Sequence, residues 1–226
     1  MFKQLLRGLR ARHAAAARGE LCAYSGFQLC PSCGSPLGHQ GLDWLTGLLD
    51  RRTWHHHADV ALTEAAARRE PISLLIADLD RFKVINDEHG HLAGDNALRQ
   101  VAGILRSVSR HQDLVARFGG DEFLVLMPGS EAADAFAAAR RLNVELNSAR
   151  LRIVSTRDGE TTLTGLSVSV GLATRCVGMG LEDLLLAADA ALLAAKRNGR
   201  AQSCCGGDGH GWTFDQVAPP YALYAR

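Results

Sequence analysis

Two clusters of acidic residues are the part of the sequence best suited to chemistry. Asp78-Leu79-Asp80 follows the mainly apolar segment 72–77, and Asp121-Glu122 follows Gly119-Gly120. Segment 72–77 is expected to be a strand, and ligand sites in α/β sheets gather at strand ends. Carboxylates that meet at one sheet edge repel one another unless a cation lies between them, and Mg²⁺ prefers such oxygen ligands. The spacing is therefore compatible with a metal site, and solvent-exposed turn acids are an equal alternative.

The elements that must position these clusters can be predicted from periodicity and from the Gly and Pro breakers. The Gly119-Gly120 pair predicts a hairpin, because glycine accepts the positive φ of a tight turn. Apolar spacing predicts helices over 51–69, 92–110, 131–147 and 181–197, and strands over 72–77, 114–118, 122–127, 151–156 and 161–174. Helices alternate with strands except at the hairpin. We therefore expect an α/β (α+β) domain with a mixed central sheet and flanking helices.

Composition bounds the class of protein. The 226 residues carry 25 Lys and Arg against 24 Asp and Glu, and this balance argues against nucleic acid as the main partner. Hydrophobic residues make up 47%, enough to bury a core. No apolar run approaches the ~20 residues of a bilayer span, and the N-terminus lacks the apolar region of a signal peptide. We expect a cytoplasmic protein without a transmembrane segment.

Three segments are expected. Residues 1–42 combine a basic amphipathic helix over 1–19 with a Cys-containing loop segment, residues 43–201 form the main domain, and residues 202–226 form a partly ordered Gly- and Pro-containing tail. The N-terminal helix is expected to pack against a second copy, with contact to an anionic membrane as the alternative. His55-His56-His57 is expected to be a helix surface and not a metal site.

The cysteines leave a structural zinc site open. Cys30-Pro31-Ser32-Cys33 has the spacing of a zinc knuckle, and Cys22 and His39 would complete a Cys₃His set, although the spacing from Cys22 to Cys30 is irregular. A reduced loop without metal is an equal alternative. Cys204 and Cys205, with His210, are other candidate ligands. Without a secretory context, reduced thiols are expected throughout.

The residues around the second acidic cluster spell GGDEF, from Gly119 to Phe123, and the chain resembles the GGDEF family of bacterial diguanylate cyclases. Further motifs of that family follow in order over residues 43–201: DWLTGL from Asp43, DLDRFKVIND from Asp78, GHLAGD from Gly90, SVSVG from Ser167, AD from Ala188 and AKRNGR from Ala195. Asp50, Leu193 and Ala201 replace the family's usual Asn, Tyr and Asn. These departures lie outside the positions that bind metal or read the base.

The resemblance implies a fold akin to nucleotidyl cyclases and the polymerase palm. It implies that two GTP molecules condense into cyclic di-GMP with release of two pyrophosphates, in a homodimer whose two domains meet face to face. By resemblance, Asp78, Asp121 and the backbone carbonyl of Leu79 bind Mg²⁺ or Mn²⁺. Asp121 is also the family's suggested general base, with Glu122 as the competing candidate.

The remaining site residues are also implied by resemblance. Lys83, Lys196 and Arg200 would bind the triphosphate, although the last two would otherwise be ordinary cations at a helix C-terminus. Asn86 and Asp95 would recognise guanine, and His91 would contact the nucleotide. Arg110 and Asp113 form an R-x-x-D motif that resembles the family's product-inhibition site, where a simple helix-end pair is the alternative. A catalytically silent GTP or cyclic di-GMP receptor is the alternative function.

Overall fold

Strand β3 (Ile72–Leu79) forms the centre of a six-stranded sheet, and all eight of its residues are buried. Its neighbours β8 (Val168–Thr174) and β5 (Glu122–Pro128) both pair with it antiparallel, and β4 (Leu114–Gly119) pairs antiparallel with β5. On the other side, β9 (Gln202–Gly206) runs parallel to β8, and β10 (Trp212–Gln216) pairs antiparallel with β9. The expected mixed sheet with flanking helices is confirmed.

This computed structural model describes residues 28–29, 36–37, 41–206 and 212–216, and the chain divides into two units, residues 1–40 and 41–226. In the first unit β1 (Gln28–Leu29) pairs antiparallel with β2 (Pro36–Leu37). The helix expected over 1–19 lies outside the described residues, as do Cys22, Cys30, Cys33 and His39. The zinc site therefore stays a prediction.

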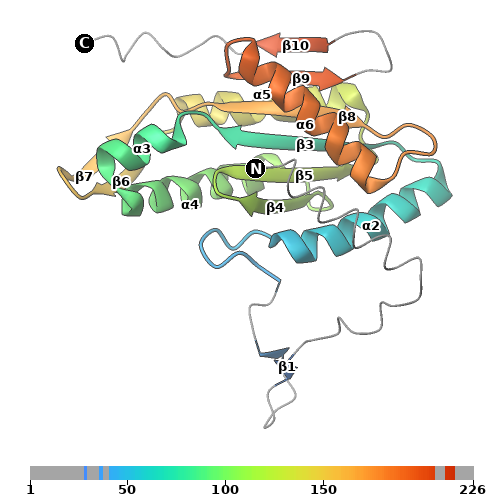
Figure 1. Cartoon of the computed structure of the whole chain (residues 1–226), viewed down its shortest axis with the longest axis horizontal. Coiled ribbons are helices and arrows are strands. Elements are labelled where there is room, and N and C mark those ends of the chain that lie inside the picture. Colours follow the sequence, from blue (N-terminus) through green and yellow to red (C-terminus); the bar gives the residue numbers. More distant parts are fainter. Residues whose placement is uncertain (1–27, 30–35, 38–40, 207–211, 217–226) are drawn as a thin grey trace. The chain divides into compact units, whose positions relative to one another are not determined.

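Helices cover both faces of the sheet, with α6 (Leu181–Arg197) in front of it and α4 (His91–Val108) and α5 (Ala132–Ser148) behind it in Figure 1. The buried positions of α4 include Leu98, Val101, Ala102 and Leu105, the periodic positions expected of a core-facing helix. They join β3, β5 and β8 in one hydrophobic cluster. On the opposite face, a Cβ added at Gly171 of β8 would overlap the backbone of α6, so that glycine lets helix and strand pack closely.

Helix α2 (Arg51–Arg68) begins and ends with clear signals. The Asp50 side chain accepts a hydrogen bond from the Thr53 amide at 2.7 Å, so this aspartate caps the helix as an asparagine would. Arg69 ends the helix with a left-handed backbone (φ 56°), shortly before Pro71. His56 and His57 are exposed, as expected for a helix surface. None of the described helices is long and apolar enough to cross a membrane.

The structure differs from, or adds to, the sequence predictions at three places. A further helix, α3 (Phe82–His89), precedes α4; it is short, it follows a left-handed Arg81 without a side-chain cap, and Gly90 separates it from α4. The strand expected over 161–174 is two strands, because the chain turns at Gly165 (φ +67°) and β7 (Gly159–Leu163) pairs instead with β6 (Leu151–Ser155). The segment expected to be a partly ordered tail contributes β9 and β10.

Candidate active site

The two acidic clusters lie side by side because β3 pairs with β5. Asp78 is the register partner of Glu122, and the Leu79 amide donates a hydrogen bond to the Asp121 carbonyl at 3.1 Å. Residues that are more than forty positions apart in the chain therefore meet at one edge of the sheet. The tight turn that carries Asp121 depends on Gly120, whose φ of +58° favours glycine.

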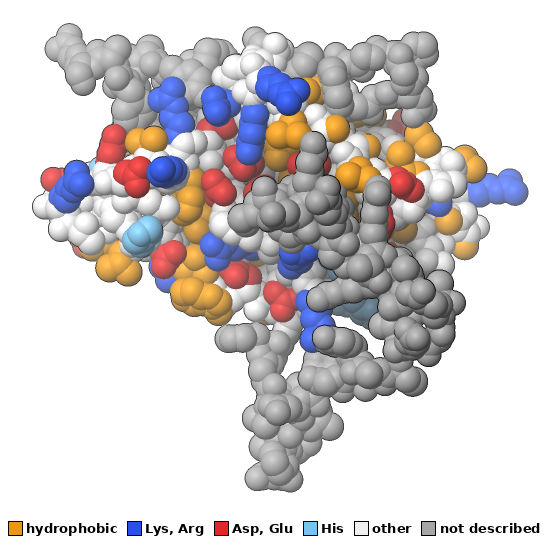
Figure 2. Space-filling view, in the orientation of Figure 1, with side chains coloured by type: hydrophobic (Ala, Val, Ile, Leu, Met, Phe, Trp, Pro, Cys, Tyr) orange, Lys and Arg blue, Asp and Glu red, His pale blue; other side chains and the backbone are white. Residues whose placement is uncertain are grey.

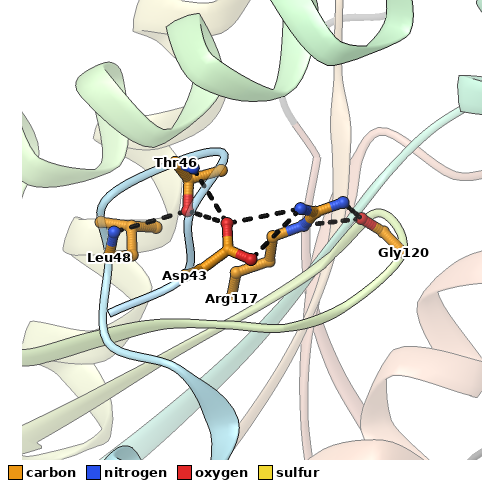
Figure 3. Close-up of polar contacts among 5 residues, drawn as sticks. All are labelled: Asp43, Thr46, Leu48, Arg117 and Gly120. Atoms are coloured by element: carbon orange, nitrogen blue, oxygen red, sulfur yellow. Dashed lines mark hydrogen bonds and ion pairs between the residues drawn. The ribbon is translucent and has the colours of Figure 1, made fainter. Parts of the chain in front are cut away.

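Arg117 anchors this turn from the neighbouring strand β4. Its Nε and Nη2 donate to the Gly120 carbonyl at 3.0 and 2.8 Å, and its Nη1 lies 3.3 and 3.4 Å from the two carboxylate oxygens of Asp43 (Figure 3). Asp43 also accepts hydrogen bonds from the Thr46 amide at 2.9 Å and hydroxyl at 2.7 Å. Although burial alone would raise the pKa of Asp43, the Thr46 hydrogen bonds and the Arg117 charge lower it below the usual value. The loop that begins at Asp43 thereby holds the glycine turn in place.

Sequence reasoning missed the role of Arg117. Asp43 and Thr46 belong to a motif that was recognised. Asp43 is 74 residues from Arg117, however, so local sequence did not indicate the contact. The sequence did contain one indication of this role: Arg117 lies two residues before Gly119, in the short strand that leads to the turn carrying Asp121.

Lys196, in the last turn of α6, pairs with Asp78. Its Nζ lies 2.6 Å from Oδ2 of that carboxylate, and the two side chains are 28% and 13% exposed. Burial raises the pKa of Asp78, Lys196 opposes the rise, and the charge of Asp121 adds to it. Burial and the charge of Asp78 likewise raise the pKa of Glu122. The carboxylates thus destabilise one another's charge, an arrangement that a cation would relieve.

The residues at this edge fit a hard divalent cation. Their donors are carboxylate and carbonyl oxygens, which Mg²⁺ and Mn²⁺ prefer. Within the described residues, no three His, Cys, Asp or Glu side chains converge into a complete cage. A site that draws only two carboxylates from the protein and the rest of its ligands from backbone, water and substrate phosphate matches the usual coordination of Mg²⁺.

The residues expected to bind nucleotide lie around the first turns of α3 and α4 and the end of α6. Lys83 and His91 are exposed, whereas Asn86 and Asp95 are half-buried. Gly94 lies against Asn86, and a Cβ at this glycine would overlap Asn86 Oδ1. Arg200 is exposed in the turn that follows α6.

Arg110 and Asp113 lie just before β4, at the end of that strand opposite the Gly119-Gly120 turn. The Arg110 amide donates to Asp113 Oδ2 at 2.7 Å, and its guanidinium lies 3.2 Å from the Ser130 hydroxyl. Burial raises the pKa of Asp113, while Arg110 and Arg141 oppose the rise. The other oxygen of Asp113 is buried without a hydrogen-bond partner.

Within the described residues, the cysteines join no group of three His, Cys, Asp or Glu side chains. In this part of the chain Cys176, Cys204 and Cys205 form no disulfide, and His210 lies outside the described residues. Cys204, in β9, is buried against α6. Its burial and the charge of Cys205 raise its pKa to about 11.

Comparison with known proteins agrees with this geometry. The family described as "Diguanylate cyclase, GGDEF domain" matches residues 40–202. The chain is 37% identical over 159 residues to the response regulator PleD of Caulobacter vibrioides (strain NA1000 / CB15N), covering 70% of this chain and 34% of PleD. It is 36% identical over 161 residues to the diguanylate cyclase DgcM of Escherichia coli (strain K12), covering 70% of this chain and 36% of DgcM.

A solved structure shares the fold. The GGDEF domain of DgcB from Caulobacter crescentus, in complex with c-di-GMP, superimposes with a TM-score of 0.69 at 32% identity, covering 74% of this chain and 96% of that chain. The chain therefore belongs to the GGDEF-domain family of diguanylate cyclases. It spans about a third of the length of the curated relatives described above.

Proposed function

We propose that this protein is a diguanylate cyclase that condenses two GTP molecules into cyclic di-GMP and releases two pyrophosphates. The observation that carries the proposal is the meeting of Asp78, Asp121 and Glu122 with Lys196 at one sheet edge, in a chain of the GGDEF family. A catalytically silent receptor remains the alternative, and the retained acids argue against it. Incubation of the purified chain with GTP and Mg²⁺ tests the proposal.

Asp78, Asp121 and the Leu79 carbonyl would hold Mg²⁺ or Mn²⁺. When bound, the metal polarises the α-phosphate and lowers the pKa of the attacking 3′-hydroxyl. Lys196 and Arg200, at the end of α6, and Lys83, in the first turn of α3, supply positive charge to the triphosphate as the pyrophosphate leaves. Glu122 is favoured over Asp121 as the proton acceptor, because a carboxylate bound to metal is a weak base.

Charged side chains of both signs are interspersed on the visible face of the described residues (Figure 2). The near-neutral total charge is therefore compatible with a local site in which acids bind the metal and Lys196 faces phosphate.

Each domain would supply one half-site, so that two copies must meet for the reaction. We expect the specific activity to rise with protein concentration.

Guanine recognition is assigned to Asn86 and Asp95, with His91 as a further nucleotide contact. An acid accepts the imino and amino protons of guanine, and an amide offers a donor and an acceptor to its edge. This assignment depends on the position of Asn86, which Gly94 allows.

Gly94→Ala is expected to raise KM for GTP about tenfold, because the added methyl group displaces the Asn86 side chain and removes about one good hydrogen bond. Steady-state kinetics checks this result. Gly103→Ala is the matched control: it lies on the same helix with open space around its Cβ position, and it should leave KM unchanged. Equal effects of the two variants would contradict the assignment.

The Arg110–Asp113 pair is assigned to product inhibition. A carboxylate such as that of Asp113 can accept from guanine N–H groups, and a guanidinium suits phosphate or a guanine edge. The c-di-GMP bound to the DgcB domain shows that a relative binds this product.

Wild-type protein is expected to bind cyclic di-GMP with micromolar or tighter affinity, and the Arg110→Ala, Asp113→Ala double variant at least about tenfold more weakly, because charge-assisted hydrogen bonds are lost. Isothermal titration calorimetry measures the difference. Arg99→Ala, on the exposed surface of α4, is the control. Undiminished binding by the double variant would refute the assignment.

A further inference from the structure

Asp80 is a buried acid that the proposed chemistry does not use. Its side chain is 5% exposed, although it stands only two residues after Asp78. One carboxylate oxygen accepts a hydrogen bond from the Ser169 hydroxyl at 2.7 Å, and the other accepts from the Ser167 hydroxyl at 2.7 Å and from the Ala201 amide at 3.1 Å. All three donors are neutral, and within residues 41–206 no cation pairs with this carboxylate. Burial of a carboxylate without a paired cation is costly, and these three hydrogen bonds offset part of the cost.

The Ala201 contact links two parts of the candidate active site. Asp80 follows β3, which carries Asp78, and Ala201 follows the turn that carries Arg200. This turn is strained, because Arg200 (φ 62°) and Ala201 (φ 49°) both have left-handed backbones without being glycine. A strained turn persists only when its surroundings hold it in place.

Two other hydrogen bonds tie the same turn to the end of α6. The Arg200 amide and the Gln202 side-chain amide both donate to the Ala195 carbonyl, at 3.2 and 2.8 Å. Ala195 precedes Lys196, whose ammonium group pairs with Asp78. Hydrogen bonds therefore connect the Asp80 carboxylate to the turn that carries Arg200, and connect this turn to the end of α6, where Lys196 lies.

We propose that Asp80 is a positioning residue, which holds the Arg200–Ala201 turn so that Arg200 and Lys196 face the triphosphate above Asp78. The proposal rests on the proposed function, since it names the residue that orients the phosphate-binding cations. The competing explanation is that Asp80 merely strengthens the pairing of β3 with β8.

Ser73 provides a control for that explanation. It lies at the opposite end of the same two strands, where its hydroxyl bonds the Ser130 carbonyl and the Thr174 hydroxyl, both at 2.8 Å. Ser73→Ala removes a buried polar link between β3 and β8 far from the turn. Asp80→Asn is the conservative variant: its amide oxygen can still accept from Ala201, and the Ser169 hydroxyl can rotate to accept from its amide nitrogen.

The test is calorimetric binding of a non-hydrolysable GTP analogue in Mg²⁺, with amide hydrogen exchange at Ala201 as a second readout. Asp80→Ala should weaken binding of the analogue about tenfold or more and speed Ala201 exchange, since the hydrogen bond that holds the turn is lost. Asp80→Asn and Ser73→Ala should stay within about threefold of wild type. Cyclic di-GMP binding at Arg110 and Asp113 should be unchanged in all three variants.

Unchanged analogue binding by Asp80→Ala, an equal loss in Ser73→Ala, or unchanged Ala201 exchange would overturn the proposal. If Asp80→Ala does not fold, Asp80→Leu takes its place under the same criteria, since leucine is close to aspartate in shape and offers no acceptor to the Ala201 amide. Failure of wild-type protein to bind the analogue would count against the proposed function alone. Hydrogen exchange at Ala201 would still decide whether Asp80 holds the turn.

Discussion

Asp121→Asn is expected to abolish cyclic di-GMP formation, with kcat lowered about a thousandfold or more. The substitution keeps the size of the side chain and removes one carboxylate of the proposed metal site, and a bound metal contributes several kcal/mol to stabilising charge in the transition state. Steady-state assays with GTP and Mg²⁺ measure the loss.

Thermal unfolding without metal separates this loss from a folding defect. The charge of Asp121 raises the pKa of both Asp78 and Glu122, so its carboxylate repels theirs. Removal of that repulsion should leave Tm unchanged or slightly higher. Asp59→Asn, on the exposed surface of α2, controls for the loss of an acid and should be fully active. More than a tenth of wild-type kcat in Asp121→Asn would contradict the role.

Lys196→Ala is expected to lower kcat/KM for GTP about a hundredfold. Its ammonium group lies 2.6 Å from Asp78 Oδ2, and loss of a charge-assisted contact to phosphate in a partly desolvated site costs about 2–3 kcal/mol. The same change leaves the Asp78 carboxylate without its partner, so Tm in the absence of metal should fall.

Arg197→Ala is the matched control for this variant. Arg197 is the neighbouring residue in the same last turn of α6, and it is exposed. Its removal should change kcat/KM less than about twofold, because a solvated surface charge contributes little. A Lys196→Ala variant that kept kcat/KM within threefold of wild type, or an equal loss in Arg197→Ala, would show that Lys196 does not bind the triphosphate.

The strand and the turn that carry Asp78 and Asp121 could be predicted from local sequence. The apolar segment 72–77 predicted a central strand, and Gly119-Gly120 predicted a hairpin, so both acidic clusters were expected where strands end. The structure has β3 at the centre of the sheet and the hairpin between β4 and β5. Such features depend on residues that are close together in the chain.

The missed features depend on contacts between distant segments. The pairing of Arg117 with Asp43 spans 74 positions, and the bond from Ala201 to Asp80 spans 121. Strand β9 has no alternating apolar pattern, because its residues 202–204 are all buried where it runs parallel to β8. Helix α3 has eight residues, fewer than a periodic pattern needs to stand out.

The most direct test of the central claim is product formation by the purified wild-type chain. Incubated with GTP and Mg²⁺ over a range of protein concentrations, it should form cyclic di-GMP and two pyrophosphates per product, at a rate that rises faster than linearly with protein concentration. Chromatography of the nucleotides measures both substrate and product. Unconsumed GTP and no cyclic di-GMP, even at the highest protein concentration, would contradict the account.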